Sequence, residues 1–142
     1  ANAETIAMAE HNELGRIGEM QACIHLVQEN YILLARNWRS GHLEIDIVAE
    51  SYGEIVFVEV KTRSHNEFDQ ARQAVTLNKK RNLIAAAHAY LRENNRVGDP
   101  YRLDIITVVG TKRPFEIKHY VYAYSERGVN ATLRHEKREF EV

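Results

Sequence analysis

Two neighbouring segments near the middle of the chain are rich in hydrophobic residues, with charged residues at a few positions between them. Residues 43–49 and 55–60 are apolar runs, and a short connector over residues 50–54, which contains Gly53, separates them. Two short apolar runs joined by a polar connector with glycine are typical of a β-hairpin with a tight turn. The pattern therefore predicts a hairpin over residues 43–61, around which the other elements are arranged.

The segments on both sides of this hairpin show helical or strand periodicity. Apolar residues recur at helical spacing in residues 10–30 and 71–95, and Thr76 is a candidate N-cap within the second of these segments. Further strands are predicted over residues 31–37, 101–109 and 115–124. The order α-β-β-β-α-β-β predicts an α/β sandwich with a mixed central sheet.

Three segments lack this regularity. Residues 1–9 are interpreted as a helical lead-in or a partly ordered terminus, and residues 62–70 as a loop beside the hairpin. The last segment, residues 125–142, is rich in charge and is expected to form a short helix or a flexible tail. We therefore expect a single domain over residues 1–124 followed by a charged C-terminal extension.

Four charged residues interrupt the hairpin strands. If Asp46 lies opposite Glu59, then Glu44 falls opposite Lys61, and all four polar groups share one face of the hairpin. Strand alternation places the apolar side chains of the first strand on the other face, and these are Leu43, Ile45 and Ile47.

Burying a carboxylate costs several kcal/mol unless the group is paired or binds a metal, so these charges need an explanation. One interpretation is a pair of cross-strand salt bridges on a solvated face. The other is a divalent-metal site with a lysine beside it. The hairpin pattern by itself leaves both interpretations open.

The first helix supplies a further carboxylate. Gly15 and Gly18 lie inside the helical pattern, and because a helix glycine costs about 0.5–1 kcal/mol relative to alanine, the pair indicates close packing against another element. Glu19 follows at the edge of the apolar stripe, where it can join a site or simply face solvent. Cys23 is expected to be a small buried apolar residue rather than a nucleophile.

Composition and charge narrow the class of protein. The chain has 142 residues, 27% of them charged, and no apolar stretch long enough to span a bilayer, so we expect a cytoplasmic protein without a membrane contact. Residues 1–60 contain three Lys or Arg and ten Asp or Glu, whereas residues 61–142 contain sixteen and ten. An acidic half for metal ions beside a basic half for phosphates suits a phosphodiesterase, although surface charges that mix on folding would give the same counts.

The residue types match the chemistry of phosphodiester hydrolysis. Carboxylates suit Mg²⁺, which prefers oxygen ligands, and a nearby lysine can orient or deprotonate a water molecule. Asp46, Glu59 and Lys61, with Glu19 from the first helix, supply these groups. Lys79 and Lys80 stand early in the second helix, where cations suit a bound phosphate but are also common on a solubilising face.

The chain also resembles a known family. Asp46 followed by Glu59-Val60-Lys61 on adjacent strands resembles the PD-(D/E)xK nuclease signature. Four blocks together resemble the bacterial YraN-type family, which is related to Holliday junction resolvases and restriction-type endonucleases, and they cover residues 14–22, 44–49, 57–63 and 102–104.

The resemblance implies a restriction-endonuclease-like fold and a role for several residues. Asp46 and Glu59 are the implied ligands of Mg²⁺ or Mn²⁺, Glu19 is an auxiliary ligand, and Lys61 is the catalytic lysine. The implied nucleic-acid contacts are Lys79, Lys80 and Arg63.

Three functions remain open at this stage. We expect a Mg²⁺- or Mn²⁺-dependent endonuclease that acts on DNA, such as branched or damaged DNA, and by analogy with junction-cutting enzymes a homodimer. The first alternative is a nuclease-fold module that binds nucleic acid without turnover, because a fold does not fix a function. The second is a structural subunit whose charged residues form ion pairs only.

Overall fold

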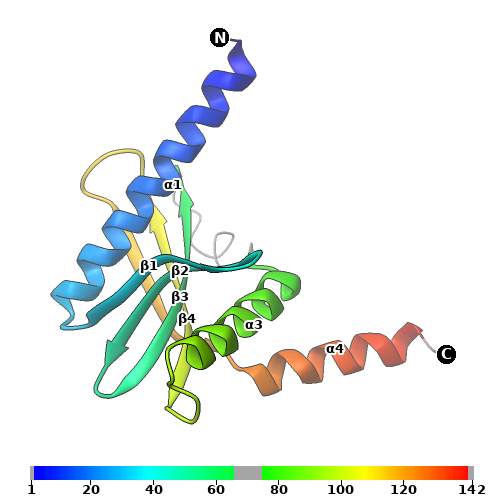
Figure 1. Cartoon of the computed structure of the whole chain (residues 1–142). Helices are drawn as coiled ribbons and strands as arrows, with labels where there is room; N and C mark the ends of the chain where they lie inside the picture. The colour runs from blue at the N-terminus through cyan, green and yellow to red at the C-terminus, as the bar shows by residue number, and fades with distance from the viewer. Residues whose placement is uncertain (1, 66–74, 141–142) are drawn as a thin grey trace.

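A computed structural model describes residues 2–65 and 75–140 of the chain (Figure 1). The elements follow the predicted order, and the charged extension adds a final helix. They are α1 (Ala3–Gln28), β1 (Ile32–Ser40), β2 (Leu43–Ser51), β3 (Glu54–Arg63), α3 (Leu77–Glu93), β4 (Tyr101–Val109), β5 (Glu116–Tyr124) and α4 (Glu126–Phe140).

The five strands form one mixed sheet in the order β1-β2-β3-β4-β5. All neighbours are antiparallel except β3 and β4, which are parallel. A parallel pair needs a crossover connection, and the segment that contains α3 provides it. Figure 1 shows α1 and α3 on opposite sides of the sheet, so the α/β sandwich is confirmed and is consistent with a restriction-endonuclease-like fold.

Two hydrophobic clusters, one on each face of the sheet, explain why residues 55–58 of β3 are all apolar. On the α3 face, Phe57 packs with Tyr90, and on the α1 face, Val58 packs with Leu26. Cys23 is buried in the second cluster, as predicted. Because a strand covered on both faces has no solvated side, polar residues in it occur only where this cover ends.

The boundaries of several elements differ from the predicted ones. Thr76 caps α3 as predicted, since its hydroxyl accepts from the Lys79 backbone N–H at 3.2 Å. The predicted loop over residues 62–70 begins later than expected, because Thr62 and Arg63 still belong to β3. The rest of that loop from residue 66, and residues 71–74 of the predicted helix, lie outside the described residues.

The two glycines of α1 have different surroundings. A Cβ atom built on Gly18 would lie 1.9 Å from Thr62 Oγ1, so the absence of a side chain lets α1 approach β3 closely. A Cβ atom on Gly15 would meet no described heavy atom within 4 Å. The predicted close packing is therefore confirmed for Gly18 and wrong for Gly15.

The alternation of side chains in β2 changes phase near Asp46. Ile45 packs with Val48 in the α3-face cluster, whereas Ile47 packs in the α1-face cluster. The prediction that Ile45 and Ile47 share a face is therefore wrong. The partner strand is also irregular here, because Asn37, which lies across from Asp46, has a φ of 50°, an uncommon value for a residue other than glycine.

A buried ion network joins β3, β4 and β5 away from this irregularity. Asp104 is fully buried, and its carboxylate accepts from Arg102 Nε at 3.1 and 3.2 Å and from the Tyr122 backbone N–H at 3.0 Å. His119 Nε2 lies 2.7 Å from the same carboxylate, and Arg102 also donates to Glu54 at 3.1 Å. These contacts satisfy a carboxylate that would otherwise be costly to bury.

The charged extension forms α4, which packs its first turns against α3 and then leads away from the sheet (Figure 1). Val129 is buried in the α3-face cluster, and Leu133 packs against that cluster. Among the described residues, the helices are too short or too polar to cross a membrane.

Candidate active site

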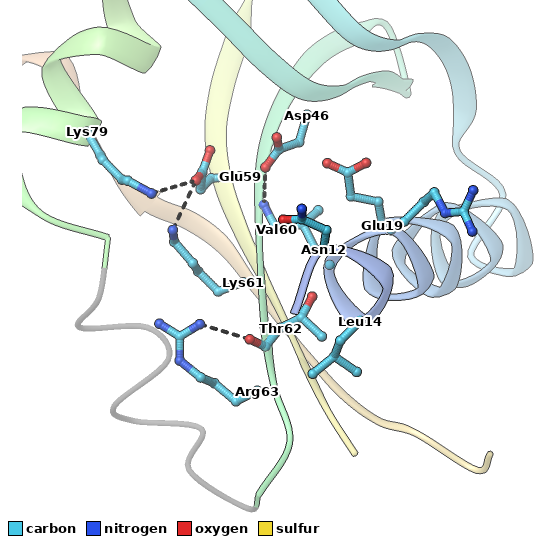
Figure 2. A pocket seen from close by; sticks show the side chains of 12 residues that line it. Asn12, Leu14, Glu19, Asp46, Glu59, Val60, Lys61, Thr62, Arg63 and Lys79 are labelled. Atoms are coloured by element: carbon cyan, nitrogen blue, oxygen red, sulfur yellow. Dashed lines mark hydrogen bonds and ion pairs between the residues drawn. The ribbon is translucent and has the colours of Figure 1, made fainter. Parts of the chain in front are cut away.

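A cavity of about 420 Å³ lies where α1, the end of β3 and the first turn of α3 meet (Figure 2). Six of the seven predicted site residues line it, namely Glu19, Asp46, Glu59, Lys61, Arg63 and Lys79. The remaining lining residues are Asn12, Leu14, Gly15, Arg16, Val60 and Thr62. The fold therefore brings together groups from four elements that are up to 60 residues apart in sequence.

Asp46 stands where the pairing of β2 with β3 ends. The last paired residues on this side are Ile47 and Val58, so Asp46 and Glu59 come next on their two strands. Asp46 Oδ2 accepts a hydrogen bond from the Val60 backbone N–H at 2.8 Å. This bond replaces the ladder contact that the strands no longer make and fixes one carboxylate oxygen, while Figure 2 shows the side chain between Glu59 and Glu19.

Two lysines reach Glu59 from different elements. Lys61 Nζ lies 3.6 Å from Glu59 Oε1, and Lys79 Nζ lies 4.0 Å from the same oxygen. Glu59 and Lys61 share a face because they are two residues apart in β3, and α3 covers that face. The Glu59 side chain is only 18% exposed, so these charges lie in a partly desolvated site.

The predicted pairing of Glu44 with Lys61 is wrong. Glu44 instead lies 3.6 Å from Arg39 on β1, and its side chain is 42% exposed. Because Lys61 contacts Glu59 on its own strand, the two cross-strand salt bridges of the structural interpretation do not form. Asp46 and Glu59, which do lie next to each other, carry charge of the same sign.

The three carboxyl groups all have raised pKa values. Burial, followed by repulsion from Asp46, raises the pKa of Glu59 to about 7, although the two lysines oppose this shift. Burial also raises the pKa of Asp46, against the hydrogen bond from Val60. The pKa of Glu19 is raised by burial first and by Asp46 second. Burial, together with repulsion among neighbouring carboxyls, therefore disfavours the charged forms of all three groups.

Lys61 is shifted in the opposite direction. Burial, and then the proximity of Lys79, lower the pKa of the Lys61 ammonium group, although Glu59 raises it. A lysine with a lowered pKa releases its proton more readily than a solvated one, which favours a role in proton transfer.

The carboxylate oxygens of Glu19, Asp46 and Glu59 are the type of ligand that a hard dication prefers. Its side-chain ligands would be carboxylate oxygens, which suit Mg²⁺ and Mn²⁺, and a bound dication would offset the burial and mutual repulsion that raise their pKa values. Within residues 2–65 and 75–140, no three His, Cys, Asp or Glu side chains are already arranged as a metal-binding group. Binding would therefore require Glu19, Asp46 and Glu59 to turn further toward a common point.

The predicted nucleic-acid contacts separate into two groups. Arg63 and Lys79 line the cavity, and Arg63 is held by a hydrogen bond of 2.8 Å to the Thr62 carbonyl oxygen. Lys80 does not line the cavity, because its ammonium group lies 5.2 Å from the centre of the Tyr124 ring. Neighbouring residues of a helix point in different directions, which explains why Lys79 and Lys80 are not together.

Sequence reasoning missed Asn37, which supports Glu19. With its amide nitrogen turned toward the carboxylate, Asn37 donates to the two Glu19 oxygens over 3.3 and 3.2 Å. This contact depends on the irregular backbone of β1 at Asn37, for which the sequence gives no recognisable signal. Asn12 and Thr62 were also missed, and both line the cavity.

These features define the class of protein: an α/β sandwich with a cavity of carboxylates and lysines at the end of a central strand. The model of Uncharacterised protein family UPF0102 matches residues 18–108, a range that includes all seven predicted site residues. The chain belongs to this family, which confirms the family part of the YraN-type resemblance.

Curated relatives support this assignment. The UPF0102 protein of Phocaeicola vulgatus is 47% identical over 117 residues, which span 82% of this chain and 96% of the relative. The UPF0102 protein of Bacteroides thetaiotaomicron has the same identity and coverage. The UPF0102 protein of Oleidesulfovibrio alaskensis is 42% identical over 103 residues, which span 72% of this chain and 51% of the relative.

Proposed function

We propose that this protein is a metal-dependent endonuclease that hydrolyses phosphodiester bonds in DNA, including branched or damaged DNA. The observation that carries the proposal is the meeting of Asp46, Glu59 and Lys61 in one cavity, with Glu19 on one side and cations on the other. Burial and the neighbouring Asp46 raise the pKa of Glu59 even though two lysines lie close to it, and a structural role alone does not explain this cost.

Asp46, Glu59 and Glu19 are the proposed ligands of Mg²⁺ or Mn²⁺. When bound, the dication would supply positive charge that polarises the phosphodiester and offsets charge on the leaving oxygen. The Val60 backbone N–H keeps Asp46 oriented toward the cavity, and Asn37 does the same for Glu19.

Lys61 is the proposed group that orients the attacking water and takes its proton. Its position beside Glu59 and its lowered pKa both suit this role. Lys79 and Arg63 are the proposed contacts of the phosphate oxygens next to the cleaved bond, because charge-assisted hydrogen bonds to phosphate are strong and position the backbone.

The experiment is a cleavage assay on supercoiled plasmid, linear duplex and four-way junction DNA with Mg²⁺, Mn²⁺ or EDTA. The variants are Asp46→Asn, Glu59→Gln and Lys61→Met, and Glu44→Gln is the matched control, since it removes an exposed carboxylate two residues from Asp46. We expect cleavage that needs the metal and falls about 100-fold or more in the three site variants, with little change in the control.

Cleavage that survives in both Asp46→Asn and Glu59→Gln would refute the proposed ligands. DNA binding without cleavage under either metal would favour the alternative, a nuclease-fold module that binds nucleic acid without turnover. A homodimer belongs to the same proposal, because paired cuts in a junction require two active sites. A cytoplasmic location is also part of the proposal. Sedimentation of the protein with and without a junction would test the dimer.

A further inference from the structure

A second set of cations lies away from the active site, in a groove that begins between α3 and α4 and extends onto α4. Two adjoining cavities of about 480 and 260 Å³ share Glu126 and Asn130 as lining residues. Arg81 on α3 lines one of them, and Arg127 and Arg134 on α4 line the other.

The charge of this groove is not balanced by its own residues. Arg81, Arg127 and Arg134 are exposed, and none has an ion-pair partner among the side chains that the structure describes. Glu126 is the one carboxylate that lines either cavity within the described residues. Three guanidinium groups therefore face one carboxylate.

That carboxylate is already engaged on the inner side of the groove. Glu126 Oε2 lies 3.0 Å from His88 Nε2 and accepts a hydrogen bond of 3.0 Å from the Tyr101 hydroxyl. The contact with His88 is the largest cause that lowers the pKa of Glu126. These contacts fix the start of α4 on α3 and β4, so the position of the arginines is defined by the fold and their charge remains available.

A run of three cations at the start of α3 lies between the active site and the groove. Lys79 lines the active-site cavity, Lys80 lies over the Tyr124 ring, and Arg81 lines the groove. Consecutive helix residues are about 100° apart around the axis, so Lys79 and Arg81 point about 200° apart, to opposite sides of α3, with the half-buried Lys80 between them. The active site and the groove therefore lie on two sides of the same helix end, and a duplex that contacts both passes around the start of α3.

The spacing along α4 indicates the kind of ligand. Arg127 and Arg134 are seven residues apart, which corresponds to about 10 Å along a helix at 1.5 Å per residue. This separation allows the two side chains to contact different phosphates of one nucleic acid backbone. Arginine also matches phosphate oxygens in a bidentate geometry.

We infer that the groove between α3 and α4 binds backbone phosphates of duplex DNA and is a second nucleic-acid contact, remote from the cleaved bond. The inference rests on the proposed function for the identity of the ligand. It assigns a role to α4, which lies beyond residue 108, where the match to the family model ends.

The test measures the binding of a fluorescently labelled duplex of about 30 base pairs by anisotropy, in EDTA and over a series of salt concentrations. The triple variant Arg81→Gln, Arg127→Gln and Arg134→Gln removes the groove cations. Its matched control removes three exposed cations outside both sites, through Arg92→Gln, Lys112→Gln and Arg113→Gln. Thermal unfolding monitored by circular dichroism verifies that both triple variants remain folded.

Each phosphate contact contributes about 0.9 to the slope of log affinity against log salt. We therefore expect the groove variant to lower that slope by about 2 to 3, and the control to leave it within about 0.5 of the wild type. Equal slopes in the groove variant and the wild type, equal losses in the two variants, or no binding by the wild type would overturn the inference.

This result is independent of the cleavage assay, because the binding measurement uses no divalent metal. A groove variant with a reduced slope, in a protein that cuts no DNA, would support the phosphate groove and refute the endonuclease. Normal binding by the groove variant, in a protein that loses cleavage on Glu59→Gln, would support the endonuclease and refute the groove.

Discussion

Replacing Glu59 with glutamine should stabilise the fold in the absence of metal while it abolishes cleavage. Glu59 is a part-buried carboxyl beside Asp46, and its pKa is raised from 4.5 to about 7. Between pH 4.5 and about 7, Glu59 is therefore protonated in the folded state and ionised in the unfolded state. The favourable contribution of this group is complete below pH 4.5 and is lost as the pH rises through about 7.

The magnitude follows from the same shift. A change from 4.5 to about 7 is about 2.5 units, and each unit corresponds to 1.36 kcal/mol, so the ionised group disfavours the folded state by about 3 kcal/mol above pH 7. Glutamine removes this cost, which is already net of the attraction to Lys61 and Lys79 at 3.6 and 4.0 Å. We therefore expect Glu59→Gln to be about 1 to 3 kcal/mol more stable than the wild type at pH 8, and about equal to it at pH 4.5.

The assay is urea unfolding of both proteins in EDTA at several pH values, read as the difference in free energy of unfolding. Taking the difference cancels the titration of groups that both proteins share, such as the histidines. Glu44→Gln is the control, and its difference should be small and vary little with pH, because that side chain is 42% exposed. A Glu59→Gln protein that is less stable than the wild type at pH 8 would refute the claim that the ionised Glu59 carboxylate disfavours the folded state.

Two other features of the fold give sharp expectations. Gly18→Ala should destabilise the protein by about 1 to 3 kcal/mol in urea unfolding because its Cβ atom would collide with Thr62, whereas Gly15→Ala should stabilise it by up to about 1 kcal/mol. The reverse order of the two variants would contradict the packing of α1 on β3. Asp104→Ala should cost about 3 to 5 kcal/mol because it leaves Arg102 buried without its main partner, and a loss below about 1 kcal/mol would show that the network adds little.

The secondary structure was predictable where periodicity is strong and local. The segment over residues 101–109 is β4 with the predicted bounds, and the hairpin forms as expected around Tyr52 and Gly53, whose positive φ values suit a tight turn between strands. The extension after residue 124 could not be decided from its charge alone. Its helix is anchored by Val129 on a core that long-range contacts create.

The candidate site was predictable in its residues but not in its geometry. Asp46 and Glu59 are neighbours because the hairpin turn fixes their register, which is a local property. The change of face near Asp46 depends on the backbone of Asn37 in another strand, and the position of Lys80 depends on Tyr124 at the far end of the sheet. Contacts of this kind arise from strand order and helix rotation, which periodicity does not encode.

The most direct measurement is a calorimetric titration of the metal-free protein with Mn²⁺, compared with Asp46→Asn and with the Glu44→Gln control. The account predicts saturable binding by the wild type and by Glu44→Gln, with release of protons near pH 7 as the Glu59 carboxyl ionises. It predicts at least about a tenfold weaker affinity for Asp46→Asn. Equal affinities in all three proteins, or no saturable binding by the wild type, would contradict the claim that these carboxylates hold a catalytic dication.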